Sequence, residues 1–275
     1  MPVEDVPVAV PEAMRVQSIS RRFGRVEVLR ELSLSFPRGQ TTVVMGPSGC
    51  GKSVMLKHLV GLLRPDAGEV WFGSVRIDSL SERGLGPIRR QIGFLFQQSA
   101  LFDSMTVHDN VAFPLREHGV LEAAEVDRRV DRVLHLVGLE DSREQMPAEL
   151  SGGQRKRIAL ARAVVLEPQV VLYDEPTTGL DPIRSDIINE LILKLNRTLG
   201  VTSIVVTHDL SSAFKVADRM VMLHEGRVRL EGTPELFRTT DDPVVQRFLR
   251  GEASPEELAR IRKGGDHAAM PIEVP

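Results

Sequence analysis

The sequence has little cysteine, few aromatic residues and no long hydrophobic run. Its single cysteine, Cys50, excludes an internal disulfide bond and is typical of a protein from a reducing compartment. No apolar run approaches the roughly 20 residues that a membrane-spanning helix needs. The 35 basic residues are balanced by 38 acidic residues, which leaves no overall basic surface for nucleic acid. We therefore expect a protein that does not bind nucleic acid and has no membrane span of its own.

The two ends of the chain differ from the part between them. Residues 1–13 are acidic and proline-rich, and they lack the basic segment and apolar core of a signal peptide. We expect a short flexible arm there, on a cytoplasmic protein. Residues 251–275 form a C-terminal extension, in which Ser254 and Glu257 match a capping box. That pattern predicts a helix over about 255–263, followed by a disordered tail.

Between these ends, residues 14–250 have the pattern of a single α/β domain. Alternating sequences predict strands in an N-terminal antiparallel β subdomain, at 14–23, 26–36 and 69–77. Four compact apolar runs are typical of buried parallel strands, at 41–45, 92–96, 170–173 and 202–206. We expect a mainly parallel sheet from these four runs.

Helical patterns separate the predicted parallel strands. One helix is expected over 52–63, and another over 182–199, where Pro182 is the first residue and Gly200 the stop. A mostly helical subdomain, about 100–165, is inserted between the second and third parallel strands. Within it, one apolar helix face is formed by Val126, Val130, Val133 and Val137.

The sequence GPSGCGKS, residues 46–53, is a phosphate-binding loop between a predicted strand and a predicted helix. Its glycines allow backbone N–H groups to turn inward around phosphate oxygens. Lys52 supplies positive charge for the outer phosphates, and Ser53 a hydroxyl for Mg²⁺. The residues expected at the nucleotide are Gly46, Pro47, Ser48, Gly49, Cys50, Gly51, Lys52 and Ser53.

Cys50 lies inside this loop, close to Lys52 and to the positive end of the following helix. Such surroundings favour the thiolate. We therefore expect a maleimide to label Cys50 in the nucleotide-free protein, and bound ATP to protect it.

Two adjacent carboxylates, Asp174 and Glu175, follow the apolar run at 170–173. Consecutive extended residues point to opposite sides, so the two side chains are expected to have different roles. Asp174 is predicted to hold Mg²⁺, largely through its water shell, and Glu175 to polarise the attacking water. Considered alone, the pair could equally be an acidic cap on a surface strand.

Two single residues follow other predicted parallel strands. Gln97 comes directly after 92–96, and His208 comes just after 202–206. Either one alone would be read as an ordinary loop residue. Ligands bind at the carboxyl ends of strands in open parallel sheets. The phosphate loop, Gln97, Asp174 and His208 would all converge there.

In the order and spacing of these motifs, residues 14–250 resemble the nucleotide-binding subunits of ABC transporters. The resemblance implies Glu175 as the catalytic base, His208 as the switch histidine, and Gln97 near the metal and the attacking water. It implies that Phe23 stacks on adenine, and it makes Asp181 part of the D-loop TGLD. The motif LSGGQ, 150–154, is the family signature, and the residues implied at the nucleotide are Ser151, Gly152, Gly153 and Gln154.

The resemblance also implies a head-to-tail dimer, with ATP between the phosphate loop of one copy and the signature of the other. This would explain an unfavourable feature of the helix that starts near Ser151. Its first turns carry Arg155, Lys156 and Arg157, although a helix N-terminus is already partly positive. The phosphates of the nucleotide would supply the missing negative charge. For any one of the three basic residues, the alternative is a position on a solvated helix face or a contact with the partner.

The segments DNVAFPLREH, 109–118, and PVVQRFLRG, 243–251, resemble the ATPases of Mla-type phospholipid transporters. That resemblance implies an ATPase on the cytoplasmic face of the inner membrane, peripheral through an integral permease subunit, with an MCE-class lipid-binding protein in the complex. The permease is expected to dock on residues 101–118.

Other functions remain open from the sequence. The ATPases of amino-acid and glycine-betaine importers share much of the same sequence. The segment 109–118 could also be an ordinary amphipathic helix that packs inside the domain. A soluble ABC ATPase is disfavoured because no sustained heptads separate Ser53 from Ser151 and because the chain has one cassette. The intact Lys52, Asp174 and Glu175 argue against a non-hydrolysing structural module.

Overall fold

The computed structural model describes residues 11–119, 122–253 and 258–259. The chain divides into two units, residues 1–234 and 235–275, and each is described by itself. Most of the predicted arm, 1–13, lies outside the described residues, although strand β1 already starts at Glu12. Most of the predicted helix over 255–263 and all of the predicted tail also lie outside them.

The N-terminal strands of the first unit form an antiparallel sheet with the order β2-β1-β4-β5. Its strands are β1 (Glu12–Phe23), β2 (Val26–Pro37), β4 (Ala67–Phe72) and β5 (Val75–Arg76). The predicted strands 14–23 and 26–36 are confirmed. The prediction of one strand over 69–77 is wrong, because the chain reverses at Gly73 (φ 54°) and pairs Phe72 with Val75.

The second sheet has the order β10-β9-β3-β8-β7-β6. Its strands are β3 (Thr41–Met45), β6 (Ile92–Leu95), β7 (Val170–Asp174), β8 (Thr202–Val206), β9 (Arg219–His224) and β10 (Arg227–Gly232). The four predicted parallel strands are confirmed to within one residue, and only β10 is antiparallel to its neighbour. Every residue of β3 and β8 is buried, as expected for central strands covered on both faces.

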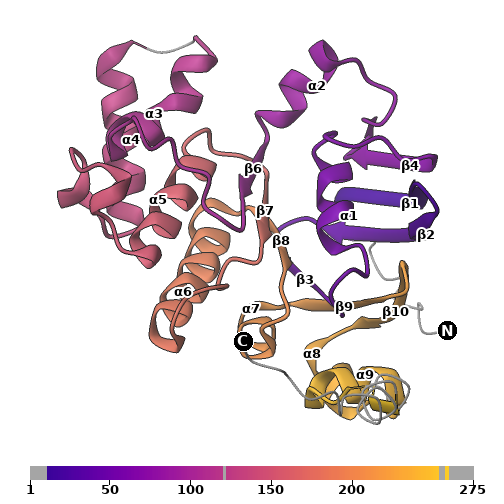
Figure 1. The fold of residues 1–275 in the computed structure, drawn as a ribbon. Coiled ribbons are helices and arrows are strands. Elements are labelled where there is room, and N and C mark those ends of the chain that lie inside the picture. The colour runs from indigo at the N-terminus through magenta and orange to yellow at the C-terminus, as the bar shows by residue number, and fades with distance from the viewer. Residues whose placement is uncertain (1–10, 120–121, 254–257, 260–275) are drawn as a thin grey trace, which may run out of the picture. The chain divides into compact units, whose positions relative to one another are not determined.

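Four helices of the first unit connect these strands (Figure 1): α1 (Lys52–Leu59), α2 (Glu82–Arg89), α6 (Pro182–Leu199) and α7 (Leu210–Val216). The prediction for α6 is confirmed at both ends. The Asp181 carboxylate accepts a hydrogen bond from the Arg184 N–H at the start, and Gly200 is left-handed at the end. Helix α1 ends at Leu59, earlier than predicted, and Gly61 follows with φ 67°.

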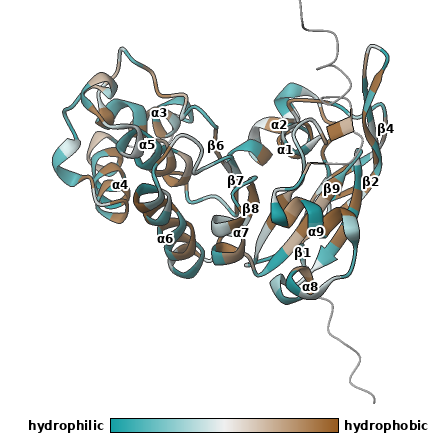
Figure 2. Cartoon of the chain, turned by 60° about the horizontal axis from the view of Figure 1, so that its bottom comes forward, coloured by the Kyte–Doolittle hydropathy of each residue, from teal (hydrophilic) through white to brown (hydrophobic). Residues whose placement is uncertain are grey.

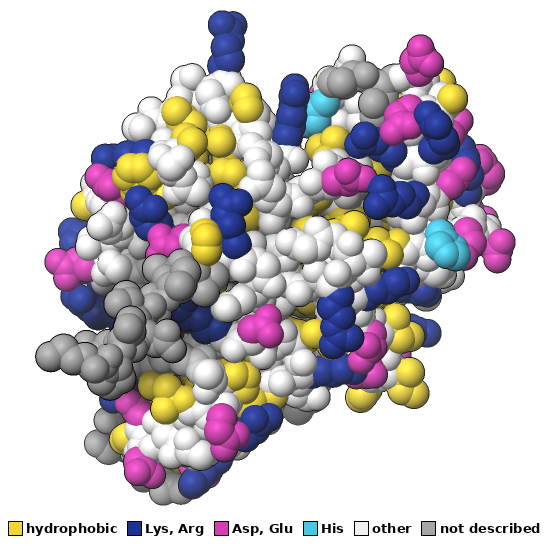
Figure 3. Space-filling model, turned by 180° about the vertical axis from the view of Figure 1, so that it is seen from behind, with side chains coloured by type: hydrophobic (Ala, Val, Ile, Leu, Met, Phe, Trp, Pro, Cys, Tyr) yellow, Lys and Arg dark blue, Asp and Glu magenta, His cyan; other side chains and the backbone are white. Residues whose placement is uncertain are grey.

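The insertion between β6 and β7 is helical, as predicted (Figure 1). It contains α3 (Val107–Glu117), α4 (Ala123–Leu136), α5 (Gly152–Val164) and two short 3₁₀ turns, Glu140–Ser142 and Pro147–Glu149. The predicted apolar face is confirmed, because Val126, Val130, Val133 and Val137 are all buried. The helices carry both hydrophobic and hydrophilic residues (Figure 2), and the surface seen in Figure 3 mixes both signs of charge.

The second unit contains α9 (Pro243–Arg250), and α8 (Pro234–Thr239) spans the boundary between the units. The Asp242 carboxylate caps α9 by accepting hydrogen bonds from Val244 N and Val245 N, and Gly251 ends it with φ 67°. Among the described residues, no helix combines the length and apolar character that crossing a membrane requires.

Candidate functional site

The phosphate loop leaves the carboxyl end of β3 and runs directly into α1. Two of its glycines are required by their surroundings. A Cβ on Gly46 would lie 2.1 Å from the Leu223 carbonyl oxygen, and one on Gly51 would lie 2.5 Å from Leu29 Cδ2. The Lys52 ammonium curls back over the loop and donates to the carbonyl oxygens of Gly46 (2.7 Å) and Pro47 (3.0 Å). The loop is thus folded around its own lysine.

Cys50 is buried in this loop, with 6% of its surface exposed, and its Sγ lies 3.9 Å from Lys52 Nζ. Burial raises the pKa of the Cys50 thiol, and the opposing effect of the Lys52 ammonium does not outweigh it. The expectation of an accessible thiolate is therefore wrong. The thiol packs inside the loop as a small apolar group.

Ser53 and Asp174 meet across the carboxyl ends of β3 and β7. The Ser53 hydroxyl donates a hydrogen bond to Asp174 Oδ1 at 3.0 Å. Burial raises the pKa of the Asp174 carboxyl, while the hydrogen bond from Ser53 opposes this shift. A nearby cation would favour the ionised form of such a carboxylate.

This hydroxyl–carboxylate pair fits Mg²⁺, a hard cation that takes oxygen ligands. No group of three or more His, Cys, Asp or Glu side chains suited to a metal occurs in the part of the chain that the structure describes. Mg²⁺ at nucleotide sites is commonly held by one or two protein oxygens, with phosphates and water completing the shell. The donor set here matches that arrangement.

Glu175 lies just beyond the end of β7. Its Oε2 lies 2.8 Å from His208 Nδ1 and accepts a hydrogen bond from Thr178 Oγ1 at 3.1 Å. Its backbone is left-handed (φ 52°), so the premise that Asp174 and Glu175 are consecutive extended residues is wrong. The two carboxylates nevertheless have separate neighbours, Ser53 for one and His208 for the other.

Several predicted residues line one cavity of about 480 Å³. Its lining includes Ser48, Gly49, Gly51, Lys52, Ser53, Gln97, Glu175 and His208, with Val28 and Val54 beside them. Val28 belongs to β2, and Lys52, Ser53 and Val54 belong to the first turn of α1. The other lining residues come from loops after β3, β6, β7 and β8, at the carboxyl ends of parallel strands. The structure therefore brings the phosphate loop, Gln97, Glu175 and His208 together, as the sequence predicts.

The signature residues do not line this cavity. Ser151 caps α5, because its Oγ accepts from Gln154 N (3.3 Å) while Gln154 Oε1 accepts from Ser151 N (2.9 Å). Gly153 is buried, and a Cβ there would lie 3.3 Å from Arg184 Cδ. The predicted site residues thus fall into two separate groups within one chain.

The basic residues at the start of α5 all donate hydrogen bonds to backbone carbonyl groups of their own chain. Arg155 bonds Leu150 O (2.6 Å), and Lys156 bonds Glu175 O (3.0 Å). Arg157 bonds the carbonyl oxygens of Val137 and Gly138. Each side chain is thus held within the fold, but a neutral carbonyl acceptor leaves its positive charge in place, so their contribution to a positive field for the nucleotide stays a prediction.

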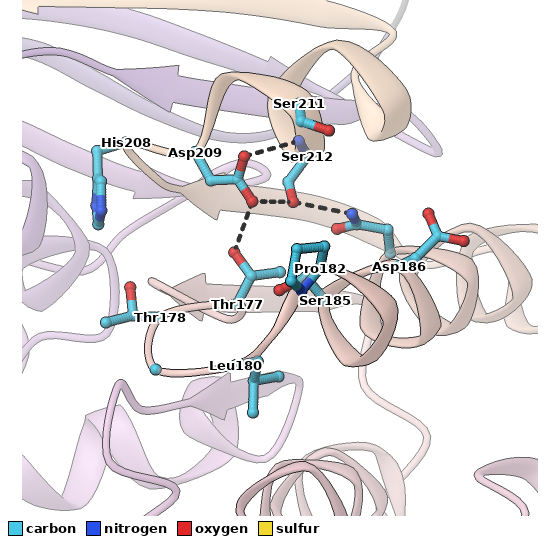
Figure 4. Close-up of a pocket in the computed structure, with 12 residues that line it drawn as sticks. Thr177, Thr178, Leu180, Pro182, Ser185, Asp186, His208, Asp209, Ser211 and Ser212 are labelled. Atoms are coloured by element: carbon cyan, nitrogen blue, oxygen red, sulfur yellow. Dashed lines mark hydrogen bonds between the residues drawn. The ribbon is translucent and has the colours of Figure 1, made fainter.

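A second cavity, of about 370 Å³, lies beside the D-loop (Figure 4). The Asp209 carboxylate accepts hydrogen bonds from Thr177 Oγ1 (3.2 Å) and Ser212 Oγ (2.6 Å). Asn189 Nδ2 in turn donates to Ser212 Oγ at 2.8 Å. Burial would raise the pKa of Asp209, but the hydrogen bonds from Ser212 and Thr177 lower it overall. Sequence reasoning missed this network, although Asp209 and Ser212 have the spacing of a helix cap.

Phe23 and Asp181 complete the predicted set. Phe23, at the end of β1, is 44% exposed, and the Arg21 guanidinium carbon lies 4.9 Å from the centroid of its ring. Arg21 is fixed by Asp66 Oδ1 at 2.7 Å. Asp181 caps α6 and also pairs with Arg184 Nε at 3.2 Å. Neither Phe23 nor Asp181 lines the phosphate-loop cavity.

Comparison with known proteins gives consistent matches. A family model described as "ABC transporter" matches residues 29–178. The probable ribonucleotide transport ATP-binding protein mkl of Mycobacterium leprae is 43% identical over 275 residues, which cover 95% of this chain and 79% of that protein. The intermembrane phospholipid transport system ATP-binding protein MlaF of Escherichia coli (strain K12) is 39% identical over 262 residues, which cover 95% of this chain and 97% of MlaF.

The fold also matches solved structures. A dimeric post-hydrolysis state of the ATP-binding cassette MJ0796, bound to ADP and Pi, superposes with a TM-score of 0.74 at 34% identity. The match covers 80% of this chain and 98% of that one. The structure of cbiO1 from Clostridium perfringens, part of the transporter complex cbiONQ, superposes with a TM-score of 0.78 at 30% identity, covering 92% and 99%.

Proposed function

Because the chain belongs to the ABC transporter family of ATP-binding proteins, we propose that it drives phospholipid transport with a membrane-embedded partner. The predicted family, α/β fold and ATPase activity are confirmed. The observation that carries the proposal is the cavity in which the phosphate loop, Gln97, Glu175 and His208 converge. In this cavity the phosphate loop, whose N–H groups would bind phosphate, shares one space with a carboxylate and an imidazole, which supports the proposal.

Several residues in and beside this cavity have a proposed task. The phosphate loop and Lys52 bind the phosphates of ATP, and Ser53 with Asp174 would hold Mg²⁺, whose charge would offset that of the phosphates. Glu175 accepts a hydrogen bond from the attacking water and so raises its nucleophilicity. His208, 2.8 Å from Glu175 Oε2, orients that carboxylate, and Gln97 lines the same cavity.

We propose that two copies pair head to tail. The N-terminus of α5, with Ser151 and two glycines, offers N–H groups suited to phosphate, yet it does not line the phosphate-loop cavity of its own chain. A second copy would bring this helix end to the nucleotide. The related cassette MJ0796 is described as dimeric. A single chain should therefore hydrolyse ATP poorly until paired.

The permease is proposed to dock on the groove beside residues 101–118. This groove, of about 480 Å³, is lined mainly by apolar groups, including Phe94, Phe96, Phe102, Phe113 and Pro114. The rings of Phe102 and Phe113 lie 4.8 Å apart, and Phe96 and Phe102 remain partly exposed. An apolar helix of the permease on the cytoplasmic side would cover them, which makes the chain peripheral to the membrane.

Phospholipid as the cargo is supported by the near full-length likeness to MlaF. The mkl relatives are named for ribonucleotide transport, which gives a second candidate cargo. We further propose an MCE-class lipid-binding protein in the complex. The amino-acid and glycine-betaine importer alternative is not favoured by these relatives.

The test is to purify the native complex from membranes through a tag on this chain. We expect a multi-span permease, an MCE-class protein and bound phospholipid, identified by mass spectrometry of proteins and extracted lipids. A co-purifying periplasmic amino-acid-binding protein without lipid would contradict the cargo. Because ATP bound at the phosphate loop is itself a ribonucleotide, the second candidate would be favoured only by a lipid-free complex that holds ribonucleotide in excess of its ATP sites.

A further inference from the structure

Lys156 is a buried cation for which the proposed ATPase chemistry has no use. It lies near the start of α5, only 5% exposed, and its ammonium donates to the Glu175 carbonyl oxygen at 3.0 Å. Burial lowers the pKa of Lys156, while the carboxylates of Glu175 and Asp174 favour its charged form. Burying an ammonium is costly unless it is paired and hydrogen-bonded, so this contact needs a reason.

The partner of Lys156 is an unusual stretch of backbone. Glu175 is left-handed (φ 52°), a conformation that costs free energy in a residue with a side chain. Its N–H donates to Val206 O in β8 at 2.9 Å. Its carbonyl oxygen accepts from the Lys156 ammonium at 3.0 Å and, at the longer distance of 3.3 Å, from the Thr178 N–H. Both backbone groups of Glu175 are therefore held: the N–H by the sheet, and the carbonyl by the local turn and by Lys156, the donor that comes from α5. This fixed backbone sets where the carboxylate meets His208 and Thr178.

We propose that Lys156 is a positioning residue that couples helix α5 to the catalytic Glu175. The inference rests on the proposed function, in which Glu175 is the base and the start of α5 contacts the nucleotide of a second copy. Lys156 lies about one turn after Gly152, the first residue of α5. A shift of α5 on engaging one nucleotide would reach, through a single hydrogen bond, the base that serves the other nucleotide.

The decisive variant is Lys156→Met, which keeps an unbranched apolar stem, ends one atom earlier and removes the donor. We expect kcat for ATP to fall ~10- to 100-fold, because a small displacement of a catalytic group has effects of that size. The KM for ATP should stay within about twofold, since the phosphate loop is untouched. Lys156→Gln keeps an N–H donor, on a side chain that is one bond shorter, and should retain more activity than Lys156→Met.

Lys194→Met is the matched control. Lys194 is exposed on α6 and also donates to a backbone carbonyl oxygen, that of Leu136 at 2.9 Å, away from the cavity. It should keep the wild-type kcat. Melting temperatures of all variants are measured in parallel, and ATP-bound dimers are measured by size exclusion. Lys156→Met should form such dimers, because it is expected to lose turnover and retain nucleotide binding.

Glu175→Gln separates this inference from the proposed function. If Glu175→Gln hydrolyses ATP at the wild-type rate, Glu175 is not the base and the proposed chemistry fails. If Glu175→Gln is inactive while Lys156→Met keeps the wild-type kcat, the chemistry stands and the role of Lys156 is overturned. If Lys156→Met loses ATP binding together with kcat, the positioning role of Lys156 is also overturned, because the lysine would then serve only to stabilise the fold.

Discussion

Replacing Phe102 tests the proposed docking groove most directly. Phe102 is 39% exposed in the free chain. A phenylalanine side chain offers about 200 Å², so a partner that covers the exposed part removes about 80 Å² from water. At about 25 cal/mol per Å² this area contributes about 2 kcal/mol, or roughly 30-fold in affinity. Phe102→Ala should weaken permease binding by about that factor, and Phe102→Asp by more, because its carboxylate would also be desolvated.

The assay measures recovery of the chain with permease-containing membranes, together with ATP binding to the purified chain. The control is Val75→Asp, because Val75 is 42% exposed on β5, in the N-terminal sheet and outside the groove. Phe102→Asp should release the chain from membranes while ATP binding persists, and Val75→Asp should release nothing. If the complex survives Phe102→Asp, Phe102 serves only the packing of the helical insertion and the docking surface lies elsewhere.

Three further predictions follow from the site. Glu175→Gln should bind MgATP and accumulate ATP-bound dimers, but single-turnover hydrolysis should slow by ~10²- to 10⁴-fold, the usual contribution of a general base; near wild-type hydrolysis would remove the assignment. A maleimide should label Cys50 slowly in the folded chain, with or without ATP, and quickly after denaturation, because the thiol is buried with a raised pKa; rapid labelling of the folded chain would contradict this. Asp209→Ala should lower the free energy of unfolding by about 1–3 kcal/mol, because Thr177 and Ser212 lose their acceptor. Since the folded pKa of Asp209 lies below the ordinary value of 3.8, its stabilisation is present above that pH and lost as the pH falls through the folded value, so urea unfolding of the variant and wild type should converge in acid.

Much of the fold could be predicted because its central strands coincide with short apolar runs in the sequence. The runs at 41–45 and 202–206 became strands with every residue buried. Strands β9 and β10 were not predicted. In β10 polar residues alternate with apolar ones, whereas β9 contains a four-residue apolar run, 220–223, that the sequence reasoning overlooked. The hairpin at Gly73 was also missed, since the residues around it alternate well enough to look like one strand.

The meeting of the site residues was predictable for a topological reason. Parallel strands end at one edge of the sheet, so residues that follow β3, β6, β7 and β8 must gather there. The burial of Cys50 could not be read from the sequence, because it depends on how the loop folds around Lys52. The contact between Lys156 and Glu175 joins residues 19 positions apart through backbone geometry, which leaves no pattern in the sequence.

The separation of the α5 N-terminus from the phosphate-loop cavity has a genetic consequence in the proposed head-to-tail dimer. One allele with a damaged phosphate loop and another with a damaged signature would each be inactive alone. In a mixed dimer, both defects fall in the same nucleotide site, and the other site combines an intact phosphate loop with an intact signature. Two null alleles of this one gene could therefore complement each other, whereas two alleles damaged in the same motif could not.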